Sequence, residues 1–160
     1  MITADEYLYF AERAVDGMAA IVADLGDDLA SRTPRLEGAN SPFGLLTHCL
    51  GVVEAWAGSF VAGRAVERDR DAEFRATGPV APLLARVTTV TAAFRADVRA
   101  ADPSAPLRMQ PPGRFQGPDR LLTQGAALQH VYEELAQHHG QMELIRDVLR
   151  AEERAGQVPA

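Results

Sequence analysis

The sequence has 160 residues, of which 47% are hydrophobic and 24% are charged, and its formal net charge is -6 at pH 7. This length and composition are typical of one globular domain with its own core. The negative charge, without a basic stripe, argues against nucleic acid as a partner, and the single cysteine excludes an internal disulfide.

The first two predicted helices have clear N-terminal signals. Thr3 and Glu6 form the T-x-x-E pattern of a capping box. Apolar residues then recur every three or four positions until Gly26, where we expect the helix to end. A second helix is predicted from Ser41–Pro42, an N-cap followed by proline, to about Gly63. It is apolar on nearly all sides, so we expect it at the centre of the fold.

The second half of the chain alternates charged or proline-rich connections with helices. Residues 64–78 are strongly charged and predict an exposed loop or a short helix, and a third helix follows to about Ala101. Five prolines in the connector 102–118 exclude a continuous helix there. The last helix is predicted from an N-cap at Asp119 to about Arg150. Its predicted core stripe is Leu121, Gly125, Leu128, Tyr132, Leu135, Met142 and Leu149.

These elements predict an all-α fold, an antiparallel four-helix bundle with long connections. We expect a single domain over residues 1–152 and a flexible tail over residues 153–160. No apolar run approaches the roughly 18 residues of a membrane span, and the N-terminal sequence MITADEYLYF lacks the features of a signal peptide. We therefore expect a cytoplasmic protein without a membrane partner, and the long helices would allow a homodimer.

Three of the four histidines lie in one stretch of the last helix, HVYEELAQHHGQ at positions 130–141. On a wheel with 100° per residue, His138 lies about 40° from Glu134, and Gln141 lies about 20° to the other side. An i, i+4 pair of this kind can bind one metal ion, and His130 with Glu134 has the same spacing. His130 and His138 lie about 12 Å apart along the axis, so only one of the two pairs can bind a given ion.

The fourth histidine, His48, lies among apolar residues of the central second helix. Alone, it is read as a buried neutral side chain bonded to a backbone carbonyl. Together with Glu134 and His138 it would complete a His₂Glu set with an open coordination position, the composition of a catalytic zinc site. His139 lies about 140° from Glu134 on the wheel and points elsewhere. The spacing alone leaves a metal site and a polar helix face as alternatives.

Two segments resemble the DinB-like superfamily of metal-binding four-helix bundles. SPFGLLTHCLGVVEAW resembles its second-helix motif, and HVYEELAQHHGQMELIRDVL resembles its last-helix motif. The similarity is greatest to the branch that contains the N-terminal domain of mycothiol-dependent maleylpyruvate isomerase and small mycothiol S-transferase-like proteins. In that branch a glutamate four residues before the last histidine replaces one histidine ligand. The resemblance therefore implies His48, Glu134 and His138 as the metal ligands.

The resemblance also implies a metal-dependent transferase that joins mycothiol, or another low-molecular-weight thiol, to a small electrophile. A divalent metal would make the thiol available as a thiolate; Zn²⁺ suits the ligands best, with Ni²⁺, Mn²⁺ and Fe²⁺ as alternatives. Gln141 stands where other superfamily members have a further histidine, and the isomerase has a C-terminal domain that this chain lacks, which argues against activity on maleylpyruvate. A metal-dependent hydrolase or isomerase and a non-catalytic metal-binding or stress-related bundle are the alternatives.

Five further side chains have alternative roles. Gln141 could hydrogen-bond a ligand or substrate, or simply cap a polar pocket. His130 is expected at the surface, with a contact to the metal ligands as its alternative. Cys49 is expected to be a small core residue. Arg108 and Arg114, on the proline-rich connector, are expected to be exposed, with contact to an anionic substrate as their alternative.

Overall fold

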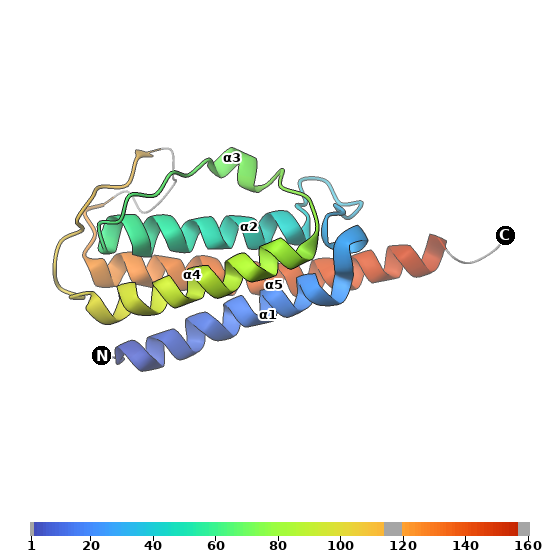
Figure 1. The fold of residues 1–160 in the computed structure, drawn as a ribbon. Helices are drawn as coiled ribbons and strands as arrows, with labels where there is room; N and C mark the ends of the chain where they lie inside the picture. Colours follow the sequence, from blue (N-terminus) through green and yellow to red (C-terminus); the bar gives the residue numbers. More distant parts are fainter. Residues whose placement is uncertain (1, 114–119, 157–160) are drawn as a thin grey trace.

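The structure is a computed structural model, and it describes residues 2–113 and 120–156. Within these ranges the long helices are α1 (Ala4–Ala30), α2 (Pro42–Val53), its π-helical continuation η1 (Glu54–Val61), α4 (Val80–Ala100) and α5 (Gln124–Gly156). A short helix, α3 (Arg70–Glu73), precedes α4, and the described residues include no β-strand. The prediction of an all-α bundle is therefore confirmed (Figure 1).

The long helices pack against one another but do not alternate strictly in direction (Figure 1). α1 and α5 run one way along the bundle, whereas α2 with η1 and α4 run the opposite way. Because α2–η1 and α4 follow each other in sequence yet run in the same direction, residues 62–79 return along the length of the bundle. This crossover carries α3 and brings it into contact with α2.

α1 is longer than predicted because it contains a kink where an end was expected. Thr3 Oγ1 accepts a hydrogen bond from the Glu6 N–H at 3.2 Å, and the Glu6 carboxylate accepts one from the Thr3 N–H at 2.7 Å, which completes the predicted capping box. Gly26 has φ 67° and ψ -177°, a conformation open to glycine because it has no Cβ. The first regular helix therefore ends at Gly26 as predicted, and a second short helical segment follows across the kink to Ala30, within the range of α1.

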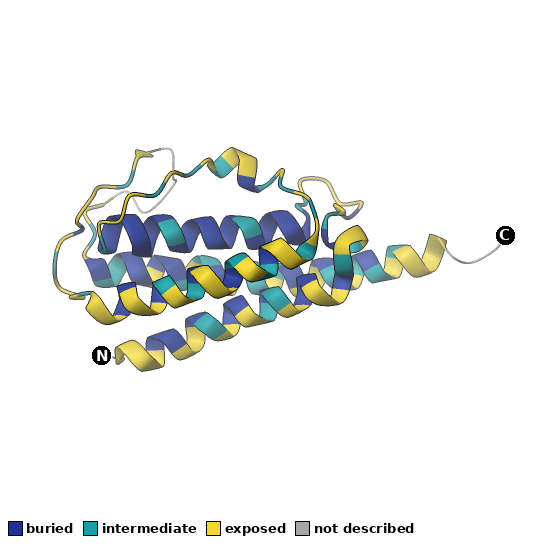
Figure 2. Ribbon diagram, in the orientation of Figure 1, coloured by how far each residue is buried: buried dark blue, intermediate teal, exposed yellow. Residues whose placement is uncertain are grey.

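α2 begins where the sequence predicted and is almost entirely buried. Ser41 Oγ accepts a hydrogen bond from the Gly44 N–H at 3.1 Å, and Pro42 lies in the first turn. Contrary to the expectation from the sequence, Pro42–Val61 is long and apolar enough to span a membrane by length and composition, but 89% of its most apolar window is buried inside the protein. Figure 2 shows this helix as the most continuously buried part of the bundle.

The start of α5 differs from the prediction. Thr123 Oγ1 accepts a hydrogen bond from the Ala126 N–H at 3.2 Å and caps the helix, which begins at Gln124. The predicted N-cap, Asp119, lies outside the described residues. Leu121 precedes the helix, so helical periodicity does not govern it, and it is 87% exposed where a core position was predicted.

The end of α5 also differs from the prediction. The helix continues to Gly156, beyond the predicted end at Arg150 and into the predicted flexible tail, while residues 157–160 lie outside the described part of the chain. Its inner face packs against α1, α2 and η1. The largest side chains that the bundle buries almost completely are Trp56, Phe94, Met18, Leu45, Leu46, Leu50, Leu135, Met142 and Leu149.

Candidate metal centre

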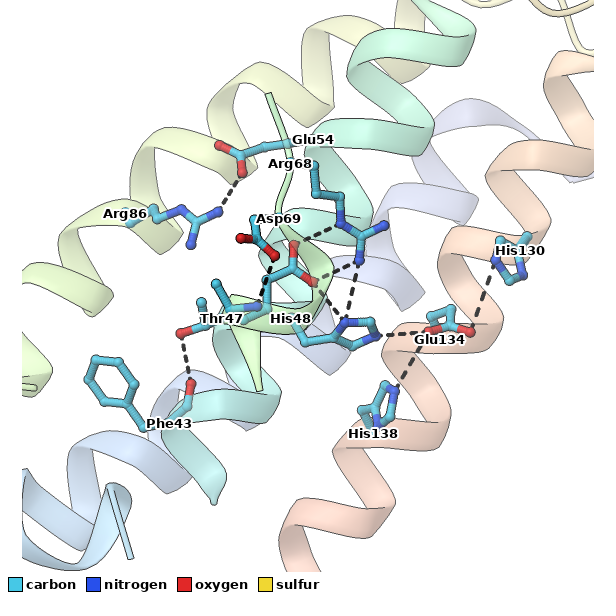
Figure 3. A network of polar contacts seen from close by, with 12 residues as sticks. Phe43, Thr47, His48, Glu54, Arg68, Asp69, Arg86, His130, Glu134 and His138 are labelled. Carbon is cyan, nitrogen blue, oxygen red and sulfur yellow. Dashed lines mark hydrogen bonds and ion pairs between the residues drawn. The ribbon is translucent and has the colours of Figure 1, made fainter. Parts of the chain in front are cut away.

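Three predicted ligands from α2 and α5 face one another in the bundle (Figure 3). His48 Nε2 lies 3.2 Å from Glu134 Oε2, and His138 Nε2 lies 3.6 Å from the same oxygen. One donor atom from each of the three side chains lies within 4.8 Å of the other two. His48 is buried on α2, whereas Glu134 and His138 are half-buried one turn apart on α5. The structure thus brings together the three residues that the sequence singled out.

The crossover supplies a second layer of partners on the far side of His48. The Nδ1 atom of His48 lies 3.0 Å from Glu73 Oε2, close enough for a hydrogen bond. Arg68 donates to both oxygens of the same carboxylate, from Nε at 2.7 Å and from Nη2 at 2.9 Å. With Nδ1–H donating to Glu73, the Nε2 atom of His48 faces Glu134 and His138, and its lone pair can bind a metal ion in place of the hydrogen bond to Glu134.

Residues 64–78 contain the short helix α3, one of the two structures predicted for this segment, but the side chains of Arg68 and Glu73 are buried. Their side chains are only 4% and 8% exposed. A buried carboxylate is costly without a charged partner, and the bidentate guanidinium of Arg68 provides that partner. Burial raises the pKa of Glu73, but the hydrogen bonds from His48 and Arg68 together lower it below its ordinary value. Glu73 is therefore an anion that fixes the orientation of His48.

Gly51 makes room for this carboxylate on α2. A Cβ at position 51 would lie 2.0 Å from Glu73 Oε1 and 2.7 Å from its Cδ. Only glycine lets the helix come this close to the Glu73 carboxylate, whose position is fixed by its contacts with His48 and Arg68. A glycine inside an apolar helix can mark a close packing contact, so Gly51, three residues after His48, was a sequence signal for this docking.

Gln141 orients His138 in a similar way. Gln141 Oε1 lies 2.8 Å from His138 Nδ1, so the imidazole donates from Nδ1 and presents Nε2 to Glu134. Burial lowers the pKa of His138, but the hydrogen bonds with Glu134 and Gln141 outweigh it and raise the pKa above its ordinary value. The pKa of Glu134 is held well below its ordinary range, first by the hydrogen bond from His138 and then by that from His48. Glu134 is therefore an anion between two imidazoles.

His130 is buried, so the expectation of a surface position is wrong. It is 9% exposed, and its ring centroid lies 4.4 Å from that of Trp56 on η1. Its Nδ1 lies 3.3 Å from Glu133, and its Nε2 lies 4.0 Å from Glu134 Oε1. His130 therefore lies beside Glu134, and a contact with the metal ligands stays a prediction for it.

Two other candidates lie outside the donor group. His139 packs over Gly17 of α1, where a Cβ would come within 2.2 Å of its Nε2, so it points away from Glu134 as predicted. Cys49 is fully buried, and burial together with the charges of Glu134 and Glu73 raises the pKa of its thiol. A buried thiol of this kind is a poor nucleophile. Any thiol chemistry at the site therefore depends on a thiol from outside the chain.

A small cavity opens at the donor group. It has a volume of about 60 Å³ and is lined by His48, Val52, Trp56, Arg68, Arg70, His130 and Glu134. The cavity joins the apolar wall of α2 and η1 to charged groups of α5 and the crossover. The arrangement can hold a cation between the two imidazoles and the carboxylate, and it leaves space beside that cation for part of a small molecule.

Replacing Gly51 with alanine should destabilise the protein, although alanine is the better helix former. The new methyl group would displace Glu73 from His48 and Arg68, and overpacking of this kind costs about 1–3 kcal/mol. We expect the free energy of unfolding, measured by urea denaturation, to fall by that amount. The matched control is Gly140→Ala on α5, where a Cβ meets nothing within 4 Å; it should stabilise by about 0.5–1 kcal/mol. Equal effects at the two positions would contradict the tight docking of Glu73.

Comparison with known proteins assigns the chain to a family. Residues 8–151 match the family model described as Mycothiol-S-transferase, a DinB-like family. This range covers nearly the whole chain and includes His48, Glu134, His138 and the crossover. Neither a curated protein nor a solved structure matches the chain. The resemblance inferred from the two helix motifs is thereby confirmed, and the chain belongs to the mycothiol S-transferase family.

Proposed function

We propose that this protein is a metal-dependent mycothiol S-transferase that joins the thiol to a small electrophile. In this proposal the metal ligands are His48 Nε2, a carboxylate oxygen of Glu134 and His138 Nε2. The observation that carries it is the convergence of these three donors, within 4.8 Å of one another, beside a cavity that His48 and Glu134 line together with further polar groups. Family membership supports mycothiol as the thiol.

The spacing of the donors suits a tetrahedral ion. Zinc binds histidine nitrogen and carboxylate oxygen at about 2.0–2.2 Å, so two ligands of a tetrahedral site lie about 3.3 Å apart. The distances of 3.2 Å and 3.6 Å from Glu134 Oε2 to the two imidazole nitrogens lie on either side of that value. Two histidines and one glutamate leave a fourth position open. Zn²⁺ is the ion that we propose, and Ni²⁺, Mn²⁺ and Fe²⁺ accept the same donors.

The metal, when bound, supplies a positive charge that makes a coordinated thiol far more acidic at neutral pH. The protein's own residues prepare the position for it. Glu73 and Arg68 fix the ring of His48, and Gln141 fixes the ring of His138. Glu134 contributes a negative charge that offsets part of the charge of a divalent ion. The apolar side chains of Val52 and Trp56 limit the access of water to this side of the cavity.

The reaction requires two substrates and no nucleophile from the chain. The sulfur of mycothiol forms a bond to an electrophilic carbon. With a halide, the carbon–halogen bond breaks and the halide leaves with the electron pair; with an epoxide, the C–O bond at that carbon breaks and the oxygen takes a proton from solvent. With an activated alkene, the double bond becomes a single bond and the neighbouring carbon takes a proton from solvent. The proton of the thiol passes to solvent. Cys49 cannot replace the external thiol, because this residue of α2 is fully buried in the core of the bundle. A hydrolase could use the same donor set with water, but the family match favours the thiol reaction.

The proposed ligands should control metal content. We expect about one divalent ion per untagged chain. His48→Ala or His138→Ala should weaken metal affinity by more than about 100-fold, which exceeds the loss usual when a residue that only hydrogen-bonds to a metal ligand is replaced. Metal content after dialysis, measured by mass spectrometry of the elements, tests this. His139→Ala removes a histidine from the same helix but outside the donor group and should retain the ion. Substoichiometric metal in the parent protein would overturn the site.

The activity should depend on both the metal and the thiol. Mycothiol and an alkylating electrophile should give the S-conjugate faster than the uncatalysed reaction, and a chelator should abolish the acceleration until Zn²⁺ is restored. His48→Ala should reduce kcat/KM by at least about 100-fold, because the ion is no longer held. Turnover of an ester or amide without any thiol would favour the hydrolase instead.

Glu73→Gln should weaken metal binding without removing a ligand. The amide is the same size as the carboxylate but no longer an anion, so it holds the His48 tautomer less firmly and removes the negative charge that pairs with Arg68. We expect a 10–100-fold loss of metal affinity, measured by competition with a chromophoric chelator. Glu54→Gln is the matched control, since Glu54 also pairs with an arginine, Arg86, at a part-exposed position away from the cavity. Equal affinities for the two variants would contradict the role assigned to Glu73.

A further inference from the structure

Arg70, the first residue of α3, places a cation at the cavity beside the candidate metal ligands. It lines the same cavity as His48, Glu134 and His130. Its Cζ lies 5.2 Å from the centroid of the Phe74 ring, and that ring stacks on His48 with a centroid separation of 4.4 Å. The aromatic contact restrains the half-buried guanidinium near the cavity without neutralising it.

Two other arginines of the crossover have carboxylate partners. Arg68 pairs with Glu73, and Arg64 pairs with Asp97. Arg70 forms no ion pair with any carboxylate among residues 2–113 and 120–156, although acidic residues flank it in the sequence. A guanidinium has a fork of N–H donors that matches the two oxygens of a carboxylate. Arg70 is therefore available for an anion that enters the cavity.

The charges around the cavity also favour an anion. Arg68 and Glu73 balance each other, and the single charge of Glu134 offsets only half of that of a divalent ion. A thiolate would offset the other half. The charge of Arg70 then still lacks a partner, and a second negative group on the substrates would supply it.

We propose that Arg70 binds a carboxylate on the electrophile, so that the preferred electrophiles are small organic acids with the reactive carbon close to the carboxylate. The inference rests on the proposed transferase function. The cavity, at about 60 Å³, admits only a few atoms. Sulfur, reactive carbon and guanidinium must therefore meet within a short distance, which places the carboxylate one or two bonds from the carbon that is attacked.

Of the two cations that the sequence suggested for an anionic substrate, only Arg108 is described by the structure. Arg108 is exposed on the connector after α4 and does not line the cavity. Arg114 lies outside the described residues. The crossover, for which the sequence predicted an exposed loop or a short helix, provides the cation instead.

Bromoacetate and bromoacetamide form a matched pair of electrophiles for the test. In both reactions the sulfur of mycothiol bonds to the methylene carbon, bromide leaves with the bonding electron pair, and the thiol proton passes to solvent. The two reagents differ in the charge beside the reactive carbon. After correction for the uncatalysed rates, we expect the zinc-loaded protein to prefer bromoacetate. Arg70→Gln should lower kcat/KM for bromoacetate about tenfold and change that for bromoacetamide by less than twofold.

Two further variants separate the role of Arg70 from a general effect of charge or folding. Arg70→Lys keeps the charge but not the planar fork, so it should recover part of the bromoacetate activity. Arg75→Gln removes a nearby exposed arginine that does not line the cavity, and it should leave both rates unchanged. An equal loss with both electrophiles in Arg70→Gln would assign the residue to the thiol or to folding and would overturn the proposal, as would no loss with either.

A binding measurement keeps the inference separate from the proposed function. Isothermal titration calorimetry of the zinc-loaded protein with S-carboxymethyl-mycothiol and S-carbamoylmethyl-mycothiol requires no turnover. The acid should bind about tenfold more tightly than the amide, and Arg70→Gln should abolish that difference. If neither bromo compound is conjugated faster than in solution, the transferase function fails, and calorimetry still decides whether Arg70 recognises a carboxylate. Equal affinities of the parent protein for both conjugates would reject that recognition.

Discussion

The imidazole of His48 connects the fold to the site because it has a partner at each ring nitrogen. Nδ1 contacts Glu73 on the crossover, and Nε2 faces Glu134 on α5. A buried polar group left without a partner costs about 1–3 kcal/mol. The centre of α2 can therefore bury a histidine only while both the crossover and α5 remain in place. One side chain links three segments that are distant in the sequence.

The crossover can bury the charge of Glu73 against the bundle only if it also supplies an opposite charge. Arg68 and Glu73 lie five residues apart on it, and their bidentate pair buries no net charge. Gly51 on α2 provides the space in which the carboxylate sits. The parallel directions of α2–η1 and α4 therefore have a consequence for the site. A hairpin connection would not return along α2 and could not place a carboxylate behind His48.

How much the sequence revealed depends on whether a contact is local. The pair Glu134 and His138 is separated by one helical turn, a distance fixed by helix geometry, so a wheel was sufficient to find it. Predicting the burial of His130 would have required knowing how α2–η1 packs against α5. Those segments run in opposite directions, and Trp56 lies eight residues after His48 just as His130 lies eight residues before His138. The histidine therefore meets the tryptophan, which no single helix reveals.

Two of the predictions that failed share a physical cause. A charged segment is usually solvated, and only the opposite charges of Arg68 and Glu73, brought together by the α3 turn, allowed residues 64–78 to be partly buried. Leu121 was assigned to a helical stripe that begins only after it. In both cases a local pattern was extended beyond the element to which it applies. The family resemblance gave the ligand set, but it gave no indication of the partners behind His48.

The two halves of the proposed site differ in how they are held. The ligands lie on long helices whose inner faces are packed, so their mutual positions are set by the bundle. Arg70 instead lies on a four-residue helix within the crossover and is held near the cavity by the ring of Phe74. A replacement of Arg70 would alter the charge that a substrate meets without disturbing the backbone of α2 or α5. Our proposals thus assign metal binding to the long helices and the choice of electrophile to the crossover. His48 connects the two, because it is a proposed metal ligand that also contacts Glu73 and Phe74 of the crossover.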